Sequence, residues 1–212
     1  MSNGFPWSRQ KVFCVGRNKT GTTSLLDVMT RLGYRSGDQP KAELLLEDWA
    51  RGDFDAIGKH CRRRNFFQDI PFSLPGTFQA MDRAFPKSRF ILTVRSNAEE
   101  WYESLVRFHT KLIGAGRVPT AEDLRAFKYR APGWLWRTQE LVYGVDEDTL
   151  YDRDHYIQHY ERHNESIRSY FQGRPGDLLK LDLSQPKALE KLCGFLGRSH
   201  EGLSMPHLNR SL

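Results

Sequence analysis

A short apolar segment that runs directly into a glycine- and threonine-rich turn is the feature that most constrains how this 212-residue chain can fold. Residues 11–16 read Lys-Val-Phe-Cys-Val-Gly, a pattern typical of a strand buried on both faces of a parallel sheet. From Thr22 to Leu32 apolar residues recur at helical spacing, and Gly33 supplies a stop signal. A strand, a tight turn and a helix in this order predict the first unit of an α/β fold.

The rest of the chain alternates between strand-like and helix-like segments. Further strands are expected at residues 55–59 (a weak pattern), 89–94 and 178–183. Helices are expected from a capping pattern at 96–99 to about residue 113, across most of 117–172, and over 186–196. Alternation of this kind predicts an α/β fold with a central parallel sheet and right-handed crossovers. Neither an internal repeat nor a linker divides the chain, so a single domain over residues 1–212 is expected.

The turn at residues 16–23, Gly-Arg-Asn-Lys-Thr-Gly-Thr-Thr, has the chemistry of an anion site. A glycine-rich turn at the start of a helix directs backbone N–H groups and the positive end of the helix dipole at one point. Gly16 and Gly21 have the spacing of a Walker A motif, but Thr22 stands where that motif requires lysine, and the lysine is Lys19. The turn therefore predicts a phosphate site that differs from a standard Mg-ATP loop.

Residues 17–25, Arg-Asn-Lys-Thr-Gly-Thr-Thr-Ser-Leu, resemble the 5′-phosphosulfate loop of sulfotransferases, which use 3′-phosphoadenosine 5′-phosphosulfate (PAPS) as donor. Residues 90–95, followed by a helix with Ser104, are similar to the site in that family where an arginine and a serine hold the 3′-phosphate. The usual spacing there is eight residues, whereas Ser104 lies nine residues after Arg95.

A third segment, Asp69-Ile70-Pro71, resembles the Asp-x-Pro segment of a largely bacterial and invertebrate branch of the family. The resemblance extends over residues 11–105 and 151–211. It implies a P-loop-like three-layer α/β/α fold with an added, mainly helical region on the acceptor side, at about residues 106–172.

The resemblance implies that the chain moves a sulfuryl group from PAPS to a hydroxyl or amine of a small molecule or glycan and releases 3′,5′-phosphoadenosine (PAP), without a required metal. Lys19 would donate to the leaving-group oxygen. Including Lys19, the donor-binding residues implied in this way are Arg17, Asn18, Lys19, Thr20, Gly21, Thr22, Thr23, Ser24, Arg95, Ser104, Asn209 and Arg210.

The acceptor has to lose a proton during the reaction, so a base is expected beside the transferred group. Asp69 is the first candidate, because it follows Phe66-Phe67 and precedes Pro71, where partial desolvation would raise its pKa. A structural role, in which Asp69 caps a turn or pairs with an arginine of residues 62–64, stays open. His60 is the second candidate for the base.

Composition narrows the partners and the compartment. The formal net charge of +6 suits an anionic partner such as a nucleotide. Three cysteines, Cys14, Cys61 and Cys193, are too few and too scattered for a disulfide framework or a clustered metal site. No stretch approaches the roughly 18 apolar residues of a membrane span, and no apolar segment of a secretory signal is visible near the start. A cytoplasmic protein without a membrane span is expected.

Three alternatives remain open at this stage. A P-loop small-molecule kinase using Mg-ATP is opposed by the displaced lysine and by the absence of an acidic residue after the strand, since Arg95 follows Val94. A basic nucleic-acid-binding protein built on Arg62-Arg63-Arg64 is opposed by the lack of a recognisable reading helix or stacking motif, so no nucleic-acid partner is expected. The third is a protein that keeps the nucleotide site and has lost catalysis.

Overall fold

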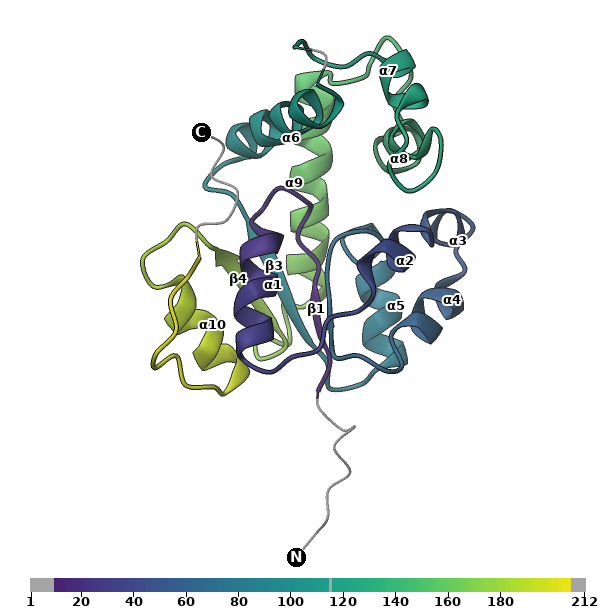
Figure 1. Ribbon diagram of the computed structural model, residues 1–212. Coiled ribbons are helices and arrows are strands. Elements are labelled where there is room, and N and C mark those ends of the chain that lie inside the picture. The colour runs from purple at the N-terminus through teal and green to yellow at the C-terminus, as the bar shows by residue number, and fades with distance from the viewer. Residues whose placement is uncertain (1–9, 115, 207–212) are drawn as a thin grey trace, which may run out of the picture. The chain divides into compact units, whose positions relative to one another are not determined.

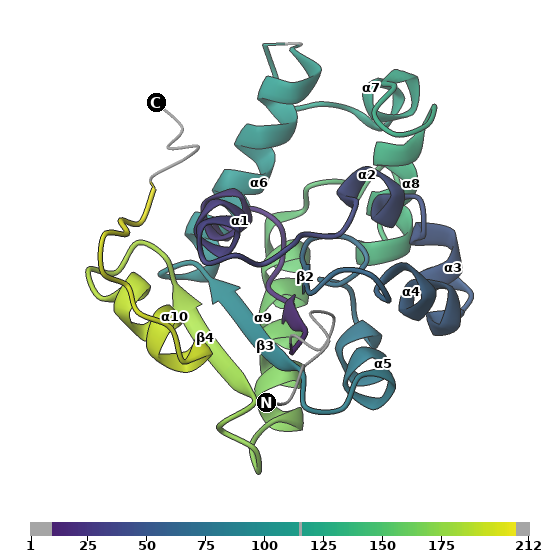
Figure 2. The ribbon, with the colours of Figure 1, turned by 60° about the horizontal axis from the view of Figure 1, so that its bottom comes forward.

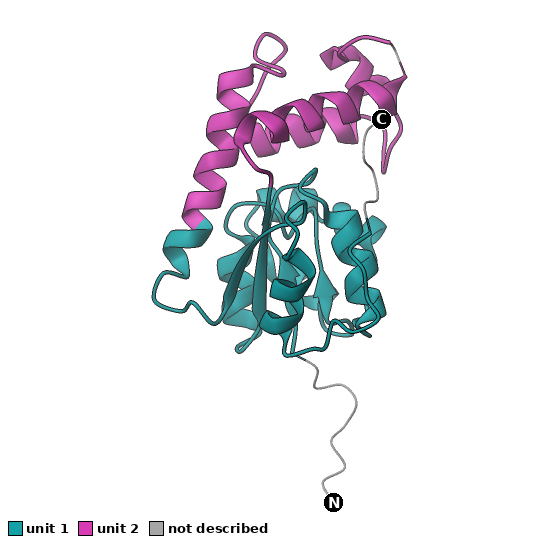
Figure 3. Ribbon diagram, turned by 90° about the vertical axis from the view of Figure 1, so that its left-hand side faces the viewer, with its two compact units in different colours: residues 1–94, 167–212 teal, residues 95–166 magenta. Residues whose placement is uncertain are grey.

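The computed structural model describes residues 10–114 and 116–206, which divide into two compact units (Figure 3). The larger unit comprises the described residues of 1–94 and 167–212, and the smaller unit comprises those of 95–166. In the larger unit lie β1 (Val12–Cys14), α1 (Thr22–Arg31), α2 (Gln39–Glu43), α3 (Leu46–Ala50), α4 (Phe54–His60), β2 (Phe66–Phe67), α5 (Thr77–Ala84), β3 (Arg89–Val94), β4 (Leu178–Asp182) and α10 (Ala188–Leu196). In the smaller unit lie α6 (Ala98–Ile113), α7 (Ala121–Ala126), α8 (Trp134–Tyr143) and most of α9 (Arg153–Tyr170).

The sheet of the larger unit has the strand order β2-β1-β3-β4, and every neighbouring pair is parallel. This confirms the predicted parallel α/β architecture. From β1 the chain passes first to β2 on one side, and then returns to β3 on the other. The order therefore reverses between β1 and β3, and a ligand site in such a sheet forms where the carboxyl ends of these two strands meet.

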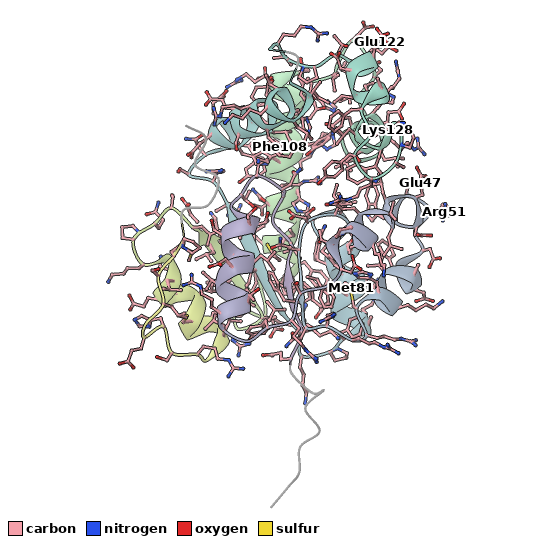
Figure 4. The ribbon with its side chains drawn as sticks, in the orientation of Figure 1. Glu47, Arg51, Met81, Phe108, Glu122 and Lys128 are labelled. Atoms are coloured by element: carbon pink, nitrogen blue, oxygen red, sulfur yellow. The ribbon has the colours of Figure 1, made fainter. Side chains whose placement is uncertain are left out.

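Helices cover both faces of the sheet, which gives three layers (Figures 1 and 2). Val12 and Cys14 point to the face covered by α1 and α10, and Phe13 points to the face covered by α4, α5 and the last turn of α9. The Phe13 ring stacks between Phe67 and Phe90, with centroid distances of 5.2 and 5.6 Å. Met81 of α5 lies in the same interior layer (Figure 4). Both faces of β1 are thus buried, as its continuous apolar pattern predicts.

The expectation of a strand at residues 55–59 is wrong, because α4 occupies them. The Asp53 carboxylate accepts a hydrogen bond from the Ala56 backbone N–H at 3.1 Å and so caps a helix start. Ile57 is the single fully buried apolar residue of this helix. The missing strand is β2, whose two residues are too few to show a period of their own.

The smaller unit is built around α6 and α9. The first helix begins one residue later than the expected capping pattern, since the Asn97 side chain accepts from the Glu100 N–H at 2.8 Å. Its predicted end at Ile113 is confirmed, and Gly114 follows with a φ of 74°. Stacked aromatic rings fill the interior, with centroids 4.5 Å apart in each of the pairs Trp101–Tyr160 and Tyr143–Tyr156. Among the described residues, no helix is long and apolar enough to cross a membrane.

Gly16 is the point at which the chain leaving β1 touches β3. A Cβ atom added there would lie 2.3 Å from both the carbonyl oxygen and the hydroxyl of Thr93. The carbonyl belongs to the buried strand β3 and cannot swing aside. A side chain at position 16 would therefore force the loop and the strand apart.

We expect Gly16→Ala to lower the free energy of unfolding by about 3 kcal/mol or more, because the added methyl group overlaps fixed backbone. Urea denaturation monitored by circular dichroism measures the change. Gly58→Ala is the matched control: its Cβ would meet nothing within 4 Å, and it lies inside α4. Since glycine is unfavourable within a helix, the control should gain about 0.5–1 kcal/mol. A Gly16→Ala protein as stable as the control would contradict the proposed contact.

Candidate active site

The loop between β1 and α1 folds back on itself at two residues with left-handed backbone. Lys19 has a φ of 68° and Gly21 a φ of 94°. Gly21 ends the loop, and α1 begins at Thr22 with no acidic side chain in its first turn. The amide groups at this end of α1 and its dipole therefore present a positive site at the carboxyl edge of the sheet.

Hydroxyl groups fasten this loop to β3. The Thr20 hydroxyl donates to the Arg17 carbonyl at 2.5 Å and lies 2.6 Å from the Thr93 hydroxyl. The Cys14 sulfur lies 3.5 Å from the same Thr93 oxygen, and burial raises the pKa of this thiol to about 12, so it stays protonated. The Thr20 hydroxyl is thus engaged within the protein, and only its backbone is suited to a ligand. Thr93 was not found by sequence analysis, because its contact with the loop arises only when β3 pairs with β1.

Arg17 lies in the interior, with 2% of its surface exposed. Its Nη1 donates to the Ser73 carbonyl at 3.3 Å. The Ser73 N–H in turn donates to the Asp69 carbonyl at 2.8 Å. Arg17 therefore ties the loop between β1 and α1 to the turn that carries Asp69, a connection that the sequence does not reveal.

Asp69 follows directly on Gln68 at the carboxyl end of β2 and has a φ of 53°. Gln68 Nε2 donates to Asp69 Oδ2 at 3.3 Å. Burial is the largest cause that raises the pKa of Asp69 to about 6; the nearby Glu43 carboxylate acts in the same direction, whereas the Thr22 hydroxyl and the Lys19 ammonium favour the ionised form. The structure thus brings Asp69 close to Lys19 of the loop and to Thr22, the first residue of α1.

Glu43 was not found by sequence reasoning, since a glutamate in a short helix carries no signal. It is buried on α2 and accepts a hydrogen bond from Gln39 Nε2 at 3.3 Å. The same Gln39 nitrogen donates to the Ile70 carbonyl at 2.9 Å. Helix α2 is therefore fastened to the residue after Asp69, and this places a second carboxylate near it.

Arg95 and Ser104 meet within the smaller unit. Arg95 Nη2 lies 3.5 Å from the buried Ser104 hydroxyl, so α6 brings the serine to the arginine despite the nine-residue spacing. The Arg95 backbone N–H donates to the Tyr160 hydroxyl at 3.0 Å. Glu100 lies 3.9 Å from Arg95 Nη1, a loose ion pair on a partly exposed side chain.

The surroundings of His60 differ from those of Asp69. Its ring packs against Phe67 and Phe72 with centroids 6.4 Å away, and its Nε2 is buried without a hydrogen-bond partner. Burial lowers the pKa of His60, and the charges acting on it come from Asp38 and Lys41.

The remaining sequence candidates are placed as follows. The arginines of residues 62–64 are exposed, and the charged groups that act on Asp69 are Glu43 and Lys19 instead. The predicted Asn209 and Arg210 lie outside the described residues.

Comparison with protein families shows to which family the chain belongs. The family model described as a sulfotransferase domain matches residues 11–211, which include segments of both units. The chain therefore belongs to the sulfotransferase family, whose domain transfers sulfuryl groups. A search among curated proteins finds no match. The fold and the family agree with the resemblance carried by residues 17–25, 69–71 and 90–95.

The raised pKa of Asp69 predicts a specific dependence of stability on pH. Its pKa lies at about 6 in the folded chain against an ordinary 3.8, so the folded state binds more protons between these values. Stability should therefore fall as the pH rises from 4 to 6, by up to about 3 kcal/mol from this group.

Asp69→Asn removes this titration, so its stability relative to the wild type should increase from pH 4 to pH 7.5. Urea unfolding of both proteins across this range measures the difference, in which the other titrating groups cancel. Parallel stability curves for the two proteins would contradict a buried carboxyl at position 69.

Proposed function

We propose that this protein transfers the sulfuryl group of PAPS to a hydroxyl or amine of a small-molecule or glycan acceptor, with PAP as the second product. The observation that carries the proposal is the buried Asp69 carboxyl beside Lys19 of the loop after β1 and Thr22 of α1. This arrangement combines a base, a cation and an anion-binding helix end, which are the three groups that the reaction requires.

Lys19 stabilises the leaving group in the proposed reaction. As the acceptor oxygen bonds to sulfur, the bond between sulfur and the bridging oxygen breaks, and negative charge grows on that oxygen. The Lys19 ammonium would donate a hydrogen bond there, while the amide groups of residues 20–23 and the Thr23 hydroxyl bind the 5′-phosphate. The Thr22 hydroxyl donates to Asp69, so Thr22 would offer the phosphate its backbone amide. The left-handed backbone of Lys19 supports this role, because it turns the loop at the lysine.

Asp69 is the proposed general base. It would take the proton of the acceptor hydroxyl as the new oxygen–sulfur bond forms. A carboxyl whose pKa is raised to about 6 is ionised at pH 7 and is a stronger base than an exposed aspartate. The Lys19 ammonium and the Thr22 hydroxyl keep the carboxylate form accessible.

Arg95 and Ser104 are proposed to bind the 3′-phosphate, with Asn209 and Arg210 as further contacts to the donor. A guanidinium offers a planar fork of donors that matches two phosphate oxygens. The buried Ser104 hydroxyl beside Arg95 Nη2 supports this assignment, since one phosphate group is able to contact both.

The donor is tested by thermal unfolding with nucleotides. PAP at micromolar concentration should raise the melting temperature without added metal, and AMP, which lacks the 3′-phosphate, should raise it far less. Arg95→Ala should remove most of this difference, a loss of roughly 2–3 kcal/mol of PAP binding. Arg107→Ala, an exposed arginine on α6 paired with Glu103, is the matched control and should keep the difference. Equal responses to PAP and AMP, or a stronger response to Mg-ATP, would reject the donor assignment.

The chemical roles are tested by turnover of radiolabelled PAPS with an acceptor found by screening. Lys19→Ala should lower kcat by about 10²–10³-fold while PAP affinity falls less. Asp69→Asn should lower turnover by about 10²–10⁴-fold and keep PAP binding, because the amide cannot accept the proton. Lys41→Ala, an exposed lysine on α2, controls for loss of positive charge. If Lys19→Ala retains kcat and only the KM for PAPS rises, Lys19 binds the donor without assisting its cleavage.

A further inference from the structure

Gln68 and Asp69 are neighbours in the chain, and yet their side chains meet. Successive side chains of an extended strand point to opposite faces. At this position the strand has ended at Phe67, and Asp69 adopts a left-handed φ of 53°. This bend brings the two polar groups together, with Gln68 Nε2 3.3 Å from Asp69 Oδ2.

The carboxylate fixes which way round the Gln68 amide lies. Because Nε2 donates to Asp69 Oδ2, the second polar atom of the Gln68 amide, the one not bonded to Asp69, is the acceptor Oε1. A reversed amide would place two oxygens against each other. Gln68 is 7% exposed, and its Oε1 is buried without a hydrogen-bond partner. Asp69 Oδ1 is likewise buried without a hydrogen-bond partner.

Two buried acceptor atoms are thus left on a pair of side chains that touch. A buried acceptor without a partner is unfavourable, whereas a ligand that supplies the missing hydrogen bond recovers that loss on binding. An acceptor molecule with one hydroxyl supplies Asp69 Oδ1 only, and it leaves Gln68 Oε1 without a hydrogen. A molecule with a second donor close to the first supplies both.

We propose that Gln68 determines acceptor specificity by binding a second O–H or N–H, carried by the carbon adjacent to the one that bears the sulfated hydroxyl. The preferred acceptors are then vicinal diols and amino alcohols. One hydrogen passes to Asp69 as the oxygen–sulfur bond forms, and the other stays on the acceptor and is donated to Gln68 Oε1. The inference rests on the proposed function, because it takes Asp69 as the base.

The test compares catechol with phenol and 2-methoxyphenol, which share the ring and the reactive hydroxyl but lack the second donor. Binding to the PAP-saturated enzyme is measured by calorimetry, and kcat/KM is measured with radiolabelled PAPS. We expect both binding and kcat/KM to favour catechol by at least about tenfold, beyond the factor of two that follows from its two equivalent hydroxyls. The reason is that phenol and 2-methoxyphenol leave a buried acceptor of the site without a hydrogen bond.

Gln68→Met keeps the length of the side chain and removes the acceptor. The preference for catechol should fall to about twofold or less, while binding of phenol and of PAP stays within about threefold of the wild type. Gln79→Met is the matched control, because Gln79 is a second glutamine with a buried, unpartnered Oε1 and lies on α5. It should keep the full preference.

The outcomes separate this inference from the proposed function. Equal binding of catechol and phenol by the wild type, no binding of catechol, or a preference that persists in Gln68→Met would overturn the role of Gln68. The wild-type comparison decides the matter even if Gln68→Met does not fold. A catechol preference in binding without any turnover would support Gln68 and contradict the sulfuryl transfer instead.

Discussion

The contact of the loop between β1 and α1 with β3 is the interaction on which the candidate site depends. Gly16 passes so close to Thr93 that no side chain fits between them, and the Thr20 hydroxyl meets the Thr93 hydroxyl at 2.6 Å. Both hydroxyls are buried, so leaving either unpaired would be unfavourable. Because Thr20 is held in this way, the loop has little freedom on either side of it, and Lys19 and the start of α1 are presented at a defined place.

The part of the larger unit that carries Asp69 is held at a cost in stability. The Asp69 carboxyl is buried beside the Glu43 carboxylate, and its backbone adopts a conformation that costs a non-glycine residue about 1–2 kcal/mol. The surrounding contacts offset this cost: Arg17 bonds to the Ser73 carbonyl, and Gln39 to the Ile70 carbonyl. The same burial that lowers stability makes the carboxylate more basic, so the strain and the proposed chemistry have one origin.

Local patterns in the sequence account for the elements that are long or continuous. The strand β3 and the helix α1 show their character within their own residues, and the loop between β1 and α1 is visible from its glycines and threonines. The short strand β2 cannot be predicted from its own residues, because these two residues gain their strand geometry from pairing with β1. The sequence also gives no local signal for three residues of the site, Thr93, Gln68 and Glu43. Each acts through a partner that lies far away in the chain or beyond a bend in it.

The register of β2 on β1 explains why so short a strand suffices. Val12 pairs with Phe66 and Phe13 with Phe67, so the residues that follow Phe67 leave the sheet where β1 is about to enter its loop. Asp69, two residues after Phe67, thereby reaches the level of the loop that carries Lys19, as the charge interaction between them indicates. A slip of one residue would exchange the two faces of β2 and place Phe67 away from the Phe13 stack. The aromatic packing below the sheet edge therefore selects the register, and the register fixes the height at which the carboxyl stands.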